Sequence, residues 1–215
     1  MKTILMVAAW CVVLFGNPAI AQTDGLLAWY PLNGTANDTT GQMAAMTLTN
    51  TPFAADGGIF CNGVPMNMEL ENWSNAETPI LPESIFKEFG MSVYFKVDEL
   101  PNGTMPVMVG GGGWRWMSIN LAGDGTVELH YNNGQRIPSE ARITPGSWHV
   151  AGMTWDSTSS TGQLYLDGVL ACSGSFVLEH GPEWDWTVGI TNQGNATNFK
   201  GAIRDIKLYA TSRIP

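Results

Sequence analysis

The chain has 215 residues, of which 44% are hydrophobic and 13% charged, with 19 acidic and 10 basic side chains. The acidic excess and the lack of a Lys/Arg cluster exclude a nucleic-acid surface, because phosphate binding needs a basic face. They also disfavour an anionic membrane as a partner. The 25 Gly, 12 Pro and weak helical periodicity favour an all-β protein.

The first 21 residues have the features of a secretory signal peptide. Lys2 gives a basic start, residues 4–15 form an apolar run, and Ala19-Ile20-Ala21 is an A-x-A cleavage signal. The run is shorter than the roughly 20 apolar residues that a span needs, so a membrane anchor is the weaker interpretation. We therefore expect a secreted, extracellular protein without membrane insertion, in which residues 22–215 form one domain.

Short apolar runs separated by turn residues predict strands along the whole mature chain. Predicted strands in the first half are 26–30, short strands near 48 and 53, 59–61, 64–70, 91–97, 107–109 and 114–121, with one helical turn at 83–89 and a loop at 98–105. Predicted strands in the second half are 127–131, 147–155, 163–166 and 169–172, with a closing strand within 199–209. Asp167-Gly168 is a type I′ hairpin signal, because both residues tolerate positive φ.

Alternation along these strands predicts which side chains are buried. Val93, Phe95 and Val97 share one face of their strand. The tryptophans that we expect in the core are Trp29, Trp116, Trp148, Trp155 and Trp186.

Three stretches carry a family resemblance: WHVAGMTWD followed by a polar loop and LYLDG within 148–168, GLLAWYPLNGTANDTTG at 25–41, and FKGAIRDIKLY at 199–209. Together they are similar to the laminin-G-like members of the concanavalin A-like lectin/glucanase superfamily. The resemblance implies an antiparallel two-sheet jelly-roll sandwich and a structural role for His149. It says little about the ligand, because this fold hosts both lectins and enzymes.

The resemblance also implies a structural Ca²⁺, a hard cation that takes six to eight oxygen ligands. Asp38 and Asp205 match the family positions for a loop ligand and a closing-strand ligand. Arg204, however, stands where the family commonly has a further Asp. The alternative is that Asp38 forms a turn and Asp205 pairs with Arg204 or Lys207.

Two cysteines remain after the signal peptide, Cys61 and Cys172, both in predicted strands. An oxidising compartment favours one disulfide between them, and two buried free thiols are the alternative. Asparagine sequons in loop-like sequence are predicted glycosylation sites in a eukaryotic host, with turn formation as the alternative role. They lie at Asn33, Asn37, Asn72, Asn102 and Asn195.

Catalytic motifs are incomplete in this sequence. Glycosidases of the superfamily carry carboxylates on alternate residues of one strand, often as E-x-D-x-x-E. The nearest pattern contains Glu69 and Glu71, but Ser74 stands where the third acid would be. No G-x-S-x-G nucleophile elbow occurs. We therefore predict that the protein is not an enzyme.

Tryptophans spaced two residues apart predict where a glycan would bind. Trp114 and Trp116, and likewise Trp184 and Trp186, would project from one face of a strand about 6.5–7 Å apart. Trp114 and Trp184 have the more loop-like settings, so we expect these two to stack on sugar rings. Neighbouring polar side chains that would bind hydroxyl groups are Asn120, Asp185, Asn192 and Gln193.

These observations predict a secreted, lectin-like carbohydrate-binding protein whose partner is a glycan. The alternative is a protein–protein adhesion or interaction module of laminin-G type, with an extracellular protein as its partner. A glycoside hydrolase is the third interpretation.

Overall fold

The computed structural model describes residues 25–64, 75–80, 87–110, 117–132, 135–178, 186–189 and 199–214. Within these ranges the regular structure consists of strands, without a helix. It follows that these ranges contain no helical segment with the length and hydrophobicity of a membrane span. The predicted all-β class is therefore confirmed for the described part of the chain.

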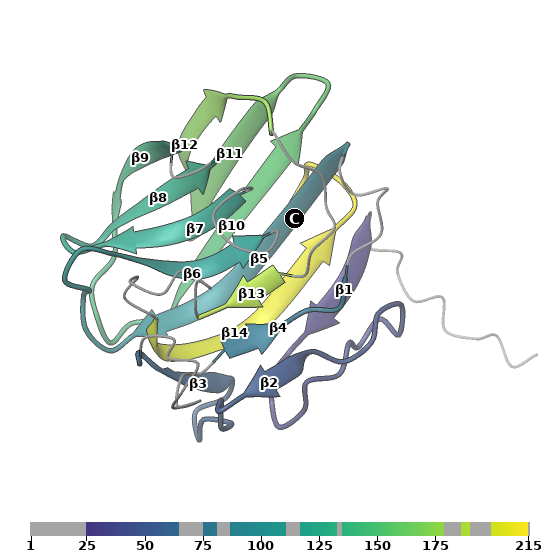
Figure 1. The fold of residues 1–215 in the computed structure, drawn as a ribbon, viewed down its shortest axis with the longest axis vertical. Coiled ribbons are helices and arrows are strands. Elements are labelled where there is room, and N and C mark those ends of the chain that lie inside the picture. The colour runs from purple at the N-terminus through teal and green to yellow at the C-terminus, as the bar shows by residue number, and fades with distance from the viewer. Residues whose placement is uncertain are drawn as a thin grey trace, which may run out of the picture.

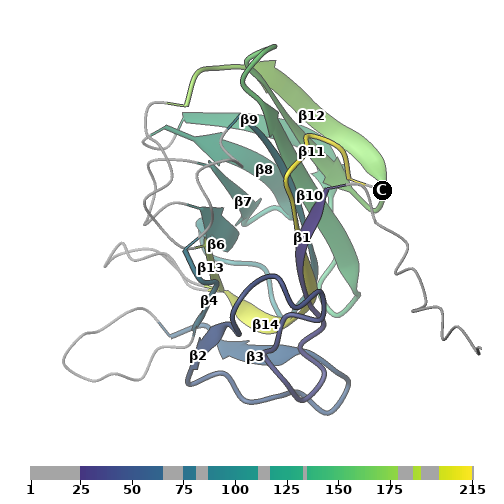
Figure 2. The same ribbon diagram turned by 90° about the vertical axis from the view of Figure 1, so that its right-hand side faces the viewer.

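The strands form two antiparallel sheets that pack face to face (Figures 1 and 2). Sheet A has the order β1-β14-β5-β10-β11-β12, with β3 also paired to β14, and its strands are β1 (Leu26–Tyr30), β3 (Ile59–Asn62), β5 (Glu88–Val97), β10 (His149–Asp156), β11 (Thr161–Leu166), β12 (Val169–Ser175) and β14 (Lys200–Tyr209). Sheet B has the order β2-β4-β13-β6-β7-β8-β9, and its strands are β2 (Thr47–Thr49), β4 (Asn75–Glu77), β6 (Thr104–Gly110), β7 (Met117–Ala122), β8 (Thr126–Tyr131), β9 (Gln135–Arg142) and β13 (Trp186–Val188). This is the predicted two-sheet sandwich.

The core lies between the sheets and is built from alternate residues of each strand. Val93, Phe95 and Val97 of β5 are fully buried, as predicted. Trp186 is also fully buried, with its ring centroid 5.7 Å from that of Phe89. Trp155 stacks on Phe176, which in turn stacks on Tyr131. The predictions for Trp155 and Trp186 are thus confirmed, and Trp116 lies outside the described residues.

Two core predictions were wrong, because these tryptophans occupy the outward positions of sheet A. In β1 the inward residues are Ala28 and Tyr30, and Trp29 between them is 37% exposed. Trp148 lies directly before β10. Its side chain is on the face opposite to that of the buried Trp155, because side chains alternate along a strand, and it is only half-buried. Apolar side chains on both faces of a strand leave the choice of inward face open, and here the smaller alanine takes the inward place.

Strand boundaries differ from the prediction mainly in sheet B. The strand β9 was not predicted, because its sequence QRIPSEAR contains Pro138 and few apolar residues. Its position at the sheet edge explains how the proline is tolerated there. β6 begins at Thr104, inside the predicted loop. The predicted strand 64–70 and most of the predicted helical turn 83–89 lie outside the described residues.

The β11–β12 turn and His149 have the structural roles that were predicted. Asp167 and Gly168 both have positive φ, 51° and 80°, which fits a type I′ turn. The Asp167 carboxylate accepts hydrogen bonds from the Val150 amide at 2.9 Å and from His149 Nδ1 at 2.8 Å. His149 therefore fixes this turn against the start of β10.

The predicted Cys61–Cys172 bridge was wrong, because both thiols are free. Cys61 on β3 and Cys172 on β12 are separated by five strand spacings in sheet A, on the order of 24 Å. A disulfide requires Cα atoms within about 7 Å of each other. Cys61 instead packs against Gly189, and Cys172 lies 3.5 Å from the Ile137 carbonyl oxygen.

The C-terminal residues 211–214 lie across the outer face of sheet A. A Cβ atom added to Gly152 would lie 2.8 Å from Ile214 Cδ1, and one added to Gly90 would lie 3.1 Å from Ile214 Cγ1. The absence of side chains at these two positions therefore makes room for Ile214 on the sheet.

Candidate functional site

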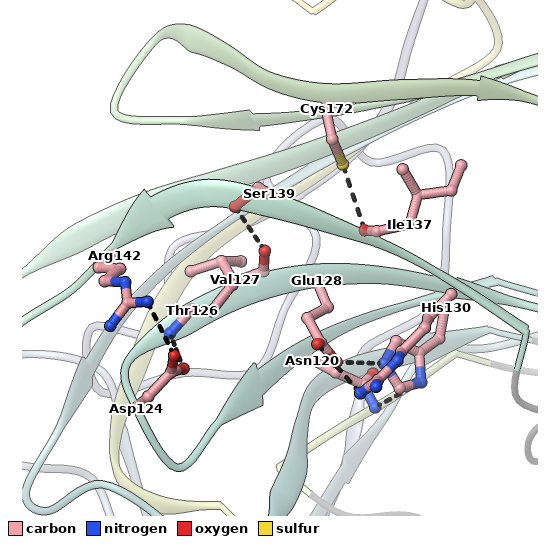
Figure 3. A network of polar contacts seen from close by, with 11 residues as sticks. Asn120, Asp124, Thr126, Val127, Glu128, His130, Ile137, Ser139, Arg142 and Cys172 are labelled. Atoms are coloured by element: carbon pink, nitrogen blue, oxygen red, sulfur yellow. Dashed lines mark hydrogen bonds and ion pairs between the residues drawn. The ribbon is translucent and has the colours of Figure 1, made fainter.

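A polar cluster lies on the face of sheet B that points away from the core. In β7 and β8 the inward residues, among them Ile119 and Leu129, are fully buried apolar side chains. The residues between them point outward, and the strand register places Asn120 opposite Glu128 and His130 opposite Arg136. We call these four residues, Asn120, Glu128, His130 and Arg136, the Glu128 cluster. Figure 3 shows Asn120, Glu128 and His130 side by side.

The carboxylate of Glu128 is the centre of this cluster. Only 6% of the Glu128 side chain is exposed. Its Oε2 lies 2.7 Å from His130 Nε2, and its Oε1 lies 3.3 Å from Arg136 Nη1. Burying an unpaired carboxylate is costly, so these two donors are what allow Glu128 to lie there. The Arg136 side chain is 59% exposed, so the cluster is open to solvent on the β9 side.

The hydrogen bonds define the roles of the His130 ring nitrogens. Nε2 donates to the Glu128 carboxylate, and Nδ1 accepts from the Asn120 side-chain amide at 3.3 Å. The Asn120 Oδ1 atom is buried and has no hydrogen-bond partner within the described part of the chain. An unpaired buried acceptor is unusual, because most such atoms are satisfied by protein, water or ligand.

The hydrogen bonds of the cluster occupy the atoms that a catalytic base would need. Ser118 lies directly opposite His130 in the strand register, which could suggest a nucleophile and its base. Both ring nitrogens of His130 are engaged by Glu128 and Asn120, however, so neither is available to take the Ser118 proton. Both oxygens of Glu128 are likewise engaged by N–H donors.

The predicted sugar-stacking residues and most of their polar neighbours lie outside the described residues: Trp114, Trp184, Asp185, Asn192 and Gln193. Their neighbours in the chain are described. Gly110, which precedes the stretch 111–116, pairs with Trp186, which follows the stretch 179–185. The fold therefore brings the borders of both stretches together on sheet B, next to β7 of the Glu128 cluster.

Asn120, which was predicted to bind sugar hydroxyl groups, lies in the Glu128 cluster. The sequence analysis did not name the other three members, Glu128, His130 and Arg136, as site residues. The sequence carried a signal for two of them. In VELHY, Glu128 and His130 alternate with apolar residues of a correctly predicted strand. Arg136 comes from β9, whose sequence gave no strand signal.

Asp38, predicted as a Ca²⁺ ligand, is instead saturated by its own loop. Its carboxylate accepts five hydrogen bonds, from the backbone amides of Trp29, Thr40, Gln42 and Met43 and from the Thr40 hydroxyl, at 2.6–3.0 Å. Burial raises the pKa of the Asp38 carboxyl, but hydrogen bonds led by that of the Thr40 hydroxyl outweigh it and hold the pKa below its ordinary value. Asp38 thus forms the turn that was the alternative to metal binding.

Asp205 is also engaged by protein groups. Its Oδ1 accepts a hydrogen bond from Trp29 Nε1 at 3.2 Å, and its Oδ2 lies 3.7 Å from Arg204 Nε. No group of three or more acidic, histidine or cysteine side chains within the described ranges could hold a metal ion. The Asp38 carboxylate already accepts five hydrogen bonds, and the Arg204 guanidinium lies beside the Asp205 carboxylate. These surroundings do not fit a Ca²⁺ site, so we assign no function to Ca²⁺.

A second surface lies on the outer face of sheet A, where cations contact aromatic rings. The Arg204 guanidinium carbon lies 4.2 Å from the Trp148 ring centroid and 5.9 Å from that of Tyr94. The Lys207 amine lies 5.1 Å from the centroid of Trp29. We call Trp29, Tyr94, Lys96, Trp148, Arg204 and Lys207 the cation–aromatic surface.

Among the predicted sequons, Asn33, Asn37 and Asn102 are exposed in loops. Asn72 and Asn195 lie outside the described residues. Glycosylation at these five positions stays a prediction.

Solved structures with a similar fold include several carbohydrate-active proteins. Domain 4 of AbnA, a GH43 extracellular arabinanase from Geobacillus stearothermophilus in complex with arabinotriose, is 18% identical with a TM-score of 0.65, over 89% of this chain and 95% of that one. Trypanosoma rangeli sialidase in complex with sialic acid is 16% identical, with a TM-score of 0.68, over 88% of this chain and 31% of that one. Botulinum neurotoxin type C, whose cell entry depends on interaction with two ganglioside molecules, is 12% identical with a TM-score of 0.68, over 88% of this chain and 49% of that one.

The chain therefore spans about a third of the sialidase and half of the neurotoxin chain, and at these identities the likeness is one of fold. No curated protein matches the sequence. A family model described as the Concanavalin A-like lectin/glucanases superfamily matches residues 70–214. This match and the antiparallel two-sheet sandwich show that the chain belongs to the concanavalin A-like lectin/glucanases superfamily.

Proposed function

We propose that this protein is a secreted, non-catalytic carbohydrate-binding protein whose glycan lies on the outer face of sheet B. The observation that carries the proposal is the Glu128 cluster. Side chains from three neighbouring strands there face away from the core, and the buried Asn120 Oδ1 has no partner among the residues that the structure describes. Sugar recognition uses such a small set of placed donors and acceptors to bind hydroxyl groups.

The neighbouring stretches supply a reason to expect a stacking surface beside these polar groups. Trp114 follows β6 by four residues, and Trp184 precedes β13 by two. β6 and β13 pair with each other, so the strand ends next to these two tryptophans in the sequence lie side by side on sheet B. Indole rings there would pack on the C–H faces of a sugar whose hydroxyl groups reach the cluster.

The comparisons support a carbohydrate ligand, since similar folds occur in an arabinanase domain in complex with arabinotriose and in a ganglioside-dependent neurotoxin. The engaged ring nitrogens of His130 support binding without catalysis. The apolar run and the A-x-A site within residues 1–21 support secretion.

A glycan array followed by affinity measurements on purified variants tests the proposal. Asn120→Ala removes the unpaired acceptor, and Trp114→Ala and Trp184→Ala remove the stacking rings. Each should weaken binding at least about tenfold, the equivalent of about 1.4 kcal/mol, and leave the melting temperature nearly unchanged. Glu140→Gln is the matched control, because Glu140 is exposed on β9 and outside the cluster.

Binding that survives all three substitutions would place the site elsewhere. Release of reducing ends from any bound polysaccharide would show that the protein is a hydrolase. The Glu69→Gln/Glu71→Gln double variant, which should behave as wild type, would then show whether those two carboxylates are responsible.

The cation–aromatic surface favours a second candidate function, a protein-interaction module. Trp29 and Tyr94 are more than a third exposed, and Arg204 lies beside Tyr94. Trp, Tyr and Arg are the residues that most often dominate binding energy in protein interfaces. If Tyr94→Ala abolishes binding of the array ligand while Asn120→Ala does not, the active surface is on sheet A.

A further inference from the structure

The outer face of sheet B and its rim carry more acid than base. The acidic side chains are Glu77 on β4, Glu128 on β8 and Asp124 in the β7–β8 turn. The basic side chains among the described residues of this face are Arg136 and Arg142, both on β9, and Figure 3 shows Arg142 beside Asp124. The exposed Glu140 on β9 adds a further negative charge.

Both of these arginines are already paired with acidic side chains. Arg136 Nη1 lies 3.3 Å from Glu128 Oε1, and Arg142 Nη2 lies 3.0 Å from Asp124 Oδ2. A carboxylate or sulfate on a ligand would have to displace one of these partners. At Arg136 it would also approach the buried negative charge of Glu128, which has little solvent around it to screen the repulsion.

The chain segments that adjoin this face in sequence strengthen the negative balance. The stretch between β6 and β7 contains Arg115 as its one charged residue. The stretch that leads into β13 contains Glu179, Glu183 and Asp185. The described part of this face therefore offers no charge complementarity for an anionic sugar.

The remaining hydrogen-bonding capacity of the cluster suits hydroxyl groups. Asn120 Oδ1 is a buried acceptor that no described group satisfies, and the exposed guanidinium of Arg136 has N–H donors beyond the one that faces Glu128. A sugar hydroxyl can donate to the first and accept from the second without adding charge.

Resting on the proposed function, we infer that the ligand of the Glu128 cluster is a neutral glycan, without uronate, sulfate or sialic acid groups where it contacts sheet B. Among the described residues of this face both arginines are paired with acidic side chains, so hydroxyl recognition there should be insensitive to ionic strength. Binding of a polyanion would weaken steeply with salt.

Isothermal titration with two panels tests the inference. The neutral panel is arabinan, xylan, mannan and β-glucan, and the acidic panel is polygalacturonate, alginate and heparin. At least one neutral glycan should bind, with an affinity that changes less than about twofold between about 50 and 500 mM NaCl. Asn120→Ala should weaken that binding at least about tenfold, and Glu140→Gln should leave it unchanged.

The outcomes separate this inference from the proposal beneath it. Salt-sensitive binding of an acidic glycan in preference to every neutral one would overturn the neutral-ligand inference and keep a glycan-binding function. Neutral binding that Asn120→Ala leaves intact would overturn the assignment to the cluster. Absence of binding to either panel and to the wider array would overturn the proposed function itself.

Discussion

Replacing Asp38 with alanine should destabilise the loop between β1 and β2, because five donors lose their common acceptor. A hydrogen bond to a charged group contributes about 1.5–3 kcal/mol when it is buried. Asp38 is half-exposed, so its donors can partly regain water, and we expect a total loss of about 2–4 kcal/mol. For a domain of this size that lowers the melting temperature by roughly 5–15 °C. Asp38→Asn, which keeps one carbonyl oxygen, should lie between wild type and alanine.

The pH dependence of this loss identifies the carboxylate as its cause. The folded pKa of Asp38 is below its ordinary value of 3.8, so the unfolded chain takes up the proton first as the pH falls. The stabilisation is therefore complete above the unfolded pKa and is lost as the pH falls through the folded pKa. Urea unfolding should show a constant difference between wild type and Asp38→Asn from about pH 5 to 8, and a smaller one near pH 3.

Two results would refute this reasoning. An equal difference at pH 3 and pH 7 would mean that the charge of Asp38 is not what stabilises the loop. A rise in wild-type melting temperature with millimolar Ca²⁺, reversed by EDTA and absent in Asp38→Asn, would restore the metal site that the donor geometry disfavours.

The other predictions concern packing, thiols and processing. Trp155→Ala should lower the free energy of unfolding in urea by about 3–5 kcal/mol, as for an emptied core position. Trp148→Ala should lower it by less than about 2 kcal/mol, because Trp148 is half-buried. Equal losses would contradict the assignment of these two side chains to opposite faces. Burial raises the pKa of Cys61 to about 12 and of Cys172 to about 11, so both should react with a thiol reagent only on unfolding, and reductant should not change the melting temperature. Mass spectrometry of the secreted protein should find a chain that starts at or near Gln22. A secreted chain that still contains residues 1–21 would contradict the signal-peptide prediction.

Local patterns predicted most of the fold, because strands and tight turns depend on neighbouring residues. The alternation in β5 identified Val93, Phe95 and Val97 as one buried face, and Asp167-Gly168 identified the β11–β12 turn. The disulfide prediction failed because it depended on the order of strands in a sheet. Cys61 and Cys172 both lie in sheet A, yet nothing in the sequence shows that five strand spacings separate them.

The candidate site shows the same division between local and non-local information. A single strand, VELHY, contains the outward-facing Glu128 and His130, and their alternation can be read from the sequence. Their partners come from other strands, Asn120 from β7 and Arg136 from β9. Only the register of β8 against both neighbours brings these four side chains into one cluster.

The buried position of Glu128 is itself an argument for recognition. Ion pairs that lie away from water rarely stabilise a fold more than apolar side chains of the same size would. Glu128 faces away from the core, so packing between the sheets does not require a carboxylate there. Its two donors, His130 and Arg136, satisfy the charge, and Asn120 fixes the other side of the imidazole while leaving its own oxygen unpaired. The network thus ends, within the described residues, in a buried acceptor without a partner, which is the feature that the proposed hydroxyl-bearing ligand would explain.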